Sequence, residues 1–198
     1  MEITASMVRE LREKTNVGMM DCKKALQDTG GDMDKAVDLL RQKGLAKAMK
    51  RAGREATEGM VHAYIHSGGR IGVLIEVNCE TDFAGKSEDF QEFVKNVAMH
   101  IAAASPLGIQ REDIPQEVVE RERAIYMAQA AESGKPANIV EKMVEGKMRK
   151  FYEENLLLEQ AYVREPDKTI QDYLNELTAK IGEKILIRRF ARFQLGGE

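Results

Sequence analysis

Few residues in this sequence have the types and spacing that enzyme chemistry requires. The three histidines, His62, His66 and His100, do not form the HExxH pattern of a zinc hydrolase, and the chain contains no GxxxxGKS/T, GxGxxG or GxSxG motif. The two cysteines, Cys22 and Cys79, form neither a disulfide framework nor a CxxC metal site. We therefore expect no catalytic residue, no metal and no cofactor, and a protein that works by binding.

One candidate binding site is the turn Thr81-Asp82-Phe83-Ala84, which follows a strand-like segment. Thr and Asp are residue types that cap the N-termini of helices, so a helix should begin here. Phe83 then has two interpretations. Its ring projects from the corner as an apolar wedge beside the Asp82 carboxylate, or it packs into the core beneath a capped helix. The local pattern alone favours the core.

A second candidate is the methionine pair Met19-Met20, placed directly after the helix-breaking Asn16-Val17-Gly18. Methionine is flexible and polarisable, which suits adaptable contact surfaces as well as cores. A core built by three short helices readily accepts only one of the two side chains, which would leave the other as an exposed apolar knob. The alternative is that both pack internally.

The elements around Met19 and Met20 form a predicted three-helix docking module, residues 1–52. A first helix is capped by Thr4 or Ser6, a second covers 19–28, and a third of about ten residues starts after Asp32. Lysines and arginines without an acidic neighbour follow, from Lys43 to Arg54. This basic run is either a solvated helix and linker or a weak contact for an acidic partner.

Residues 53–198 have the pattern of an α+β domain. Period-two segments at 60–66 and 70–77, joined by a glycine turn, and a third at 184–193 predict a three-stranded antiparallel sheet packed on helices. Helical periodicity or helix signals mark 90–101, 115 to about 132, 137–154 and 169–181. The chain's own helices would cover one face of so small a sheet. We expect a second copy to cover the other, giving a homodimer.

Composition excludes several classes of function. The 198 residues carry 30 Lys and Arg against 33 Asp and Glu, a net charge of -3 that is unsuited to coating nucleic acid. Aromatic residues make up 6% and Trp is absent, which makes the chain a poor candidate for a base-stacking platform. No apolar run approaches the roughly 18 residues of a membrane span. We expect a cytoplasmic protein without direct nucleic-acid or membrane contact.

The two candidate segments together resemble the signature segments of bacterial elongation factor Ts. Residues 11–26 are similar to the family pattern Thr-Gly-x-Gly-Met-Met-Asp-Cys-Lys-x-Ala-Leu, and residues 76–86 to Glu-x-Asn-Cys-x-Thr-Asp-Phe-Val. Segments 98–102, 133–136 and 141–146 are also family-like, and the single hairpin-plus-helix unit resembles the short form. Two positions depart: Asn16 replaces the usual Gly, and Ala84 replaces Val, which shortens an apolar contact beside Phe83.

The resemblance implies an exchange factor for guanine nucleotides that binds elongation factor Tu, in its GDP-bound and nucleotide-free states, and promotes GDP release. The N-terminal module would be similar to ubiquitin-associated domains and dock through Arg12, Met19 and Met20. Thr81, Asp82, Phe83 and Ala84 would intrude near the partner's Mg²⁺ and phosphates. The hairpin residues Tyr64, His66 and Arg70 would reach a distal β domain of the partner, in a homodimer.

Two other functions stay open at this point. A small hydrolase or transferase would use His100 or Cys79, although nothing in the sequence places a base or a cation beside the thiol. A general peptide- or ubiquitin-binding module would use residues 1–52 alone and leave the remainder without a role. Binding to elongation factor Tu that GDP weakens would distinguish an exchange factor from both.

Overall fold

The computed structural model describes residues 3–15, 17–51 and 53–197, which group into two compact units. The first unit comprises Met1–Met60, Glu76–Phe93 and Tyr173–Arg188, and the second Val61–Ile75, Val94–Asp172 and Arg189–Glu198. The long strands pass from one unit into the other. The predicted division at residue 52, a position outside the described residues, stays a prediction about which segments fold independently.

The N-terminal helices confirm the predicted three-helix arrangement. They are α1 (Ala5–Thr15), α2 (Met19–Asp28) and α3 (Met33–Arg51). The Thr4 hydroxyl caps α1 by accepting a hydrogen bond from Met7 N (3.3 Å), and Asp32 caps α3 by accepting from Lys35 N (3.0 Å). Small and branched apolar side chains close the core between the helices, namely Val8, Leu11, Cys22, Ala25, Leu26, Ala36 and Leu40.

The length predicted for the third helix was wrong. Helix α3 has 19 residues rather than about ten and continues through most of the basic run. The segment beyond Leu40 is rich in Lys, Ala, Leu, Met and Arg, which are strong helix formers, so intrinsic propensity favours a helix that extends beyond the predicted end. Asn16, where the sequence departs from the family pattern, lies outside the described residues.

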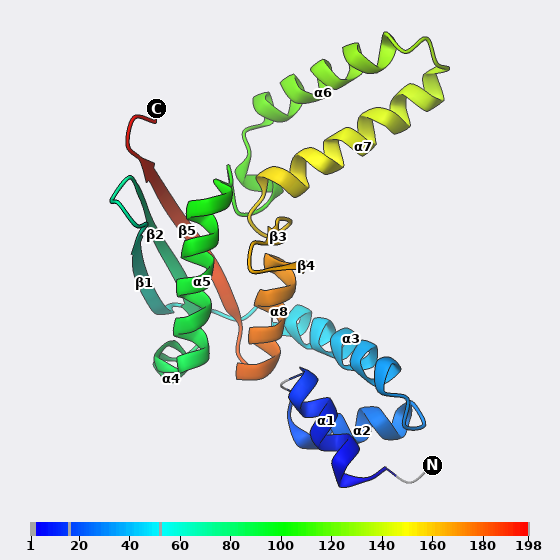
Figure 1. Cartoon of the computed structure of the whole chain (residues 1–198), viewed down its shortest axis with the longest axis vertical. Helices are drawn as coiled ribbons and strands as arrows, with labels where there is room; N and C mark the ends of the chain where they lie inside the picture. Colours follow the sequence, from blue (N-terminus) through cyan, green and yellow to red (C-terminus); the bar gives the residue numbers. More distant parts are fainter. Residues whose placement is uncertain (1–2, 16, 52, 198) are drawn as a thin grey trace. The chain divides into compact units, whose positions relative to one another are not determined.

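The predicted antiparallel sheet is confirmed, with strand order β1-β2-β5 (Figure 1). The strands are β1 (Glu58–Ile65), β2 (Ile71–Cys79) and β5 (Ile185–Gln194). Helix α5 (Glu88–Ala104) lies along one face of the sheet, and the Arg192 guanidinium of β5 donates to Ala102 O at its end. Buried residues alternate along β2 as Val73, Ile75 and Val77, so the core lies on that face.

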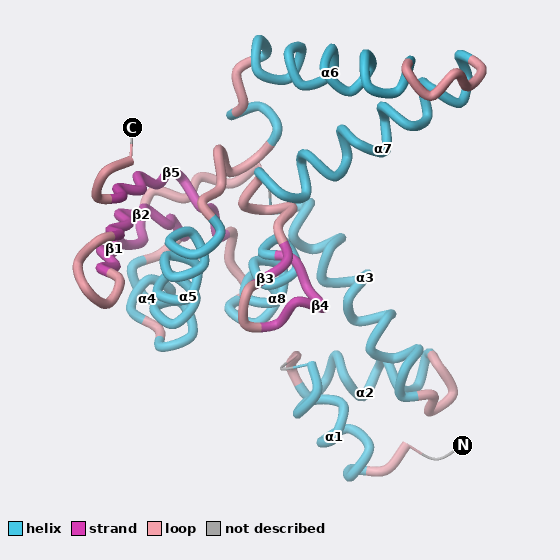
Figure 2. The backbone as a smooth tube through the Cα atoms, turned by 45° about the horizontal axis from the view of Figure 1, so that its top comes forward, coloured by secondary structure: helices cyan, strands magenta, loops and turns pink. Residues whose placement is uncertain are grey.

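Two long helices, α6 (Gln116–Ala131) and α7 (Ala137–Asn155), lie side by side as an antiparallel hairpin (Figures 1 and 2). Pro115 and Pro136 stand at their N-caps, where the missing N–H costs nothing. The hairpin has a core of its own, which contains Ile114, Ala130, Val140, Val144, Met148, Phe151 and Leu156. A 3-10 turn (Arg111–Asp113) precedes it.

A second, two-stranded sheet, formed by β3 (Ala161–Tyr162) and β4 (Glu165–Thr169), was not predicted. Strands this short, one of them containing Pro166, carry no period-two signal. Helix α8 (Ile170–Ile181) follows, capped by Thr169 as predicted. No described helix combines the length and the apolar character that crossing a membrane requires.

Candidate functional site

The turn after β2 forms a capped corner that displays one aromatic ring. Helix α4 (Asp82–Lys86) begins here, and the Thr81 hydroxyl caps it by accepting a hydrogen bond from Ala84 N (3.3 Å). Because Thr81 is the cap, Phe83 occupies the first helical turn and points outwards, where 85% of the residue is exposed. The core interpretation of Phe83 was therefore wrong, and the projecting ring is confirmed.

Small residues allow this corner to pack closely against the sheet. Ala84 is buried, so its side chain supports the corner from within, and a Cβ added at Gly85 would lie 3.4 Å from Gly59 Cα. Gly59 has φ +133°, and a Cβ there would lie 2.1 Å from Val77 O, so glycine is required. The Cys79 thiol donates to Thr81 O (3.0 Å).

The charges on α4 pair with each other. The Lys86 ammonium donates to Asp82 Oδ2 at 2.7 Å, one helical turn away. This hydrogen bond, with the charge of Lys86, lowers the pKa of Asp82, and the same contact raises the pKa of Lys86. The Asp82 carboxylate is thus held ionised at the surface beside Phe83.

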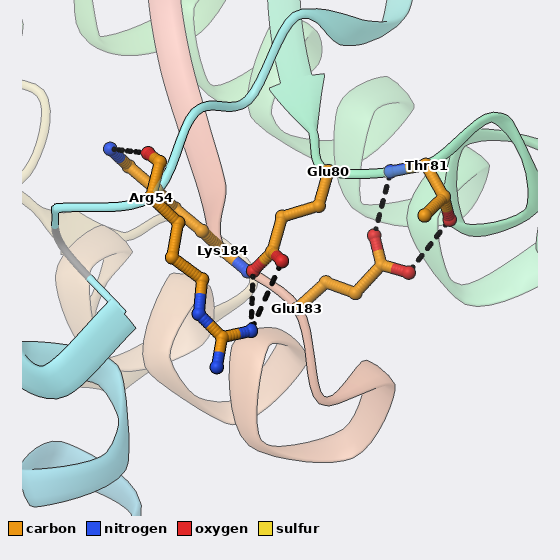
Figure 3. A network of polar contacts seen from close by, with 5 residues as sticks. All are labelled: Arg54, Glu80, Thr81, Glu183 and Lys184. Atoms are coloured by element: carbon orange, nitrogen blue, oxygen red, sulfur yellow. Dashed lines mark hydrogen bonds and ion pairs between the residues drawn. The ribbon is translucent and has the colours of Figure 1, made fainter.

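A network of polar contacts joins the corner to the segment after α8 (Figure 3). Thr81 donates twice to Glu183, from its backbone N to Oε2 (3.0 Å) and from its hydroxyl to Oε1 (2.7 Å). Lys184 N donates to Glu80 Oε1 (2.6 Å), and Arg54 forms an ion pair with Glu80 (3.1 Å). Sequence reasoning missed Glu183, because 102 residues separate it from Thr81 and no periodicity links them.

On the N-terminal helices, Met19 and Met20 occupy the first turn of α2, exposed by 55% and 78%. Neither belongs to the core of this module, so the prediction that one packs inside was wrong, as was the alternative that both do. Arg12, on α1, is also exposed. The three predicted docking residues therefore present a cation and two apolar side chains to solvent.

The predicted hairpin residues divide between two surroundings. The Tyr64 hydroxyl lies 3.0 Å from His66 Nδ1, so these two side chains form one polar pair at the hairpin end. Arg70 instead lines a shallow apolar hollow with Ile65, Leu74 and Phe193. Further exposed apolar residues lie around this hollow on the outer side of the sheet, the face opposite α5. Together the exposed apolar residues of this side are Val61, Ile65, Leu74, Phe193 and Leu195.

The residues of the rival enzyme hypothesis are buried. His100 has no exposed surface; its Nδ1 accepts from Val163 N (3.3 Å), which leaves Nε2–H to donate to Gln160 Oε1 (2.9 Å). Burial lowers the pKa of His100 and raises that of the Cys79 thiol, to which the nearby Glu183 charge also contributes. Within the described residues, no three His, Cys, Asp or Glu side chains gather as metal ligands.

Comparison with known proteins gives one consistent result. A family model described as Elongation factor TS matches residues 7–196. Elongation factor Ts of Syntrophobacter fumaroxidans is 83% identical over 198 residues, covering 100% of this chain and 99% of its own. Elongation factor Ts of Geotalea daltonii is 65% identical, and the match covers 99% of this chain and 91% of the relative. Elongation factor Ts of Desulfosudis oleivorans is 63% identical, and the match covers 98% of both chains.

Proposed function

The chain belongs to the elongation factor Ts family of translation factors, and from that premise we propose that it is a guanine nucleotide exchange factor. It binds elongation factor Tu in the cytoplasm and accelerates the release of GDP without chemistry of its own. The observation that carries the proposal is the exposed ring of Phe83 on a capped, tightly seated corner.

The wedge must act through a distorted partner site. If binding of this chain lowers the affinity of elongation factor Tu for GDP, thermodynamic reciprocity requires GDP to lower its affinity for this chain by the same factor. Thr81, Asp82, Phe83 and Ala84 are proposed to enter beside the phosphates and Mg²⁺, which hold a nucleoside diphosphate chiefly by charge and backbone amides. Burial of the Phe83 ring in an apolar slot contributes about 1.5–3 kcal/mol of binding free energy, which favours the distorted site over the site that holds the nucleotide.

The docking residues contribute affinity. Met19 and Met20 offer exposed, adaptable apolar contacts, and Arg12 adds a charge, so α1 and α2 are proposed to dock on the nucleotide-binding domain of elongation factor Tu. Tyr64, His66 and Arg70 are proposed to reach its distal β domain. Their exposed polar groups suit a surface contact, and the partner that the structure gives His66 is the Tyr64 hydroxyl rather than an orienting carboxylate.

A homodimer is proposed through the outer side of the sheet. Five apolar residues on this side are between 48% and 71% exposed, namely Val61, Ile65, Leu74, Phe193 and Leu195. Apolar side chains collected on one face mark an interaction surface, and a second copy offers a self-complementary cover. In such a dimer one subunit supplies the Phe83 corner and the other the hairpin.

The experiment is a stopped-flow assay of a fluorescent GDP analogue bound to elongation factor Tu. Release should accelerate in proportion to added chain and saturate, and excess GDP should weaken capture of elongation factor Tu on the immobilised chain. Unaccelerated release would refute the exchange function. Capture that is indifferent to GDP would instead support a binding module built on residues 1–52.

A further inference from the structure

The Phe83 corner is tied by a residue that is distant in sequence. Glu183 follows α8 directly after Gly182 and meets Thr81 with both carboxylate oxygens, 3.0 Å from the backbone N and 2.7 Å from the hydroxyl (Figure 3). Hydrogen bonds to a charged acceptor are shorter and stronger than neutral ones. Glu183 therefore fixes the backbone and the side chain of the residue that caps α4.

The Thr81 hydroxyl performs two tasks that depend on each other. It has one proton, which it donates to Glu183, so only its lone pairs remain to face Ala84 N and cap the helix. Without Glu183 the hydroxyl can rotate and donate to a nearby carbonyl instead. The carboxylate thus determines the orientation in which Thr81 starts the turn that carries Phe83.

The neighbouring residues make the same connection in the opposite direction. Glu80 accepts from Lys184 N (2.6 Å) while Glu183 accepts from Thr81 N, so each two-residue segment supplies one carboxylate to a backbone amide of the other. The Lys184 ammonium also donates to Arg54 O (2.8 Å). Two reciprocal clamps hold the corner in register more firmly than one contact would.

We propose that Glu183 is a positioning residue for exchange: it holds Phe83 in the orientation that enters the partner, without touching the partner itself. This inference rests on the exchange function proposed above. Reactions that depend on placement lose up to about 100-fold for a displacement near 1 Å, so loosening the corner should lower the maximal exchange rate. Affinity, which the proposal assigns largely to Met19 and Met20, should change little.

The test compares Glu183→Gln with Glu159→Gln. Glu159 is a matched control, since it also accepts two close contacts, from Arg111 Nε (2.7 Å) and Nη2 (2.9 Å), outside the corner. In the stopped-flow assay Glu183→Gln should lower the maximal rate roughly 5- to 20-fold and alter the half-saturating concentration less than about twofold. Glu159→Gln should match the wild type. Glu183→Asp, which keeps the charge but is too short for both contacts, should be intermediate.

A second readout uses the free chain. The sequence has no Trp, so Phe83→Trp provides a single reporter on the corner. Adding Glu183→Gln should lower its fluorescence anisotropy and increase quenching by acrylamide, and adding Glu159→Gln should change neither. Wild-type rates and wild-type anisotropy in either folded Glu183 variant would overturn the positioning role. If the unaltered chain fails to accelerate GDP release, the exchange function fails, and the anisotropy still decides whether Glu183 holds the corner.

Discussion

Replacement of Phe83 by alanine separates binding energy from folding energy. With 85% of Phe83 exposed, its ring makes few contacts within the chain, and a surface substitution of this kind alters the unfolding free energy by about 0.5 kcal/mol or less. Thr81, Ala84 and Gly85, which build the corner, are untouched by the change. The thermal midpoint should therefore match the wild type.

In the proposed complex with elongation factor Tu, the same substitution should carry a cost. Full burial of a phenyl side chain contributes about 1.5–3 kcal/mol, and a factor of ten in rate corresponds to about 1.36 kcal/mol. Phe83→Ala should accordingly slow stimulated GDP release by about 10- to 150-fold. Stopped-flow release of a fluorescent GDP analogue at saturating chain measures this rate directly.

A control variant distinguishes the corner from general apolar exposure. Leu107, after α5, is 60% exposed and lies outside every proposed contact, so Leu107→Ala should leave the rate unchanged. The wedge would be refuted if Phe83→Ala released GDP as fast as the wild type while remaining folded. An equal loss in the Leu107 variant would show that exposed apolar area, rather than this ring, matters.

Four further predictions concern other parts of the chain. Met20→Ser should weaken capture of elongation factor Tu by about 5- to 20-fold, whereas Met127→Ser on α6 should have no effect; equal affinities in calorimetry would contradict the docking role. Leu74→Arg should convert a dimer into a 22.3 kDa monomer in sedimentation at micromolar concentration, and a monomeric wild type would exclude the dimer. Gly59→Ala should lower the unfolding free energy by at least about 2 kcal/mol in urea denaturation, while Gly146→Ala, whose added methyl meets open space, should raise it by about 0.5–1 kcal/mol. Burial lowers the pKa of His100 in the folded chain, so the unfolded chain binds more protons below about pH 6.5. The unfolding free energy should therefore fall on acidification more steeply in the wild type than in His100→Gln. Parallel curves of unfolding free energy between about pH 7 and 5 would show that His100 does not contribute to this pH dependence.

Regular periodicity made much of the fold predictable. The hairpin, the helix that carries Phe90 and Phe93, and the final strand follow from spacings of two or 3.6 residues, and the bounds of α2 and α8 follow from Gly18 and Thr169 next to apolar patterns. The β3–β4 pair lacked such a signal. Its pairing is irregular, with a register shift between Ala161 and Tyr162, and it is continued beyond the strands by Ile170 N donating to Gln160 O (3.0 Å).

The orientation of Phe83 depended on a difference of one residue. Thr81 and Asp82 are both good N-cap residues, and moving the cap by one position rotates a side chain by about 100° around the helix. Glu183 decides in favour of Thr81 from 102 residues away, and no local pattern contains that contact. The expectation that one of the two methionines packs inside was wrong because the buried core of the module includes Cys22 of α2 but neither Met19 nor Met20.

The pairing of Asp82 with Lys86 affects how the corner approaches its partner. The two charges, 2.7 Å apart, give helix α4 no net side-chain charge, and the field of such a pair falls off faster than that of a single ion. A lone carboxylate advancing on a bound diphosphate would be repelled and its encounter rate would depend on salt. In the proposed encounter with elongation factor Tu, Lys86 beside Asp82 should reduce that repulsion and its dependence on salt.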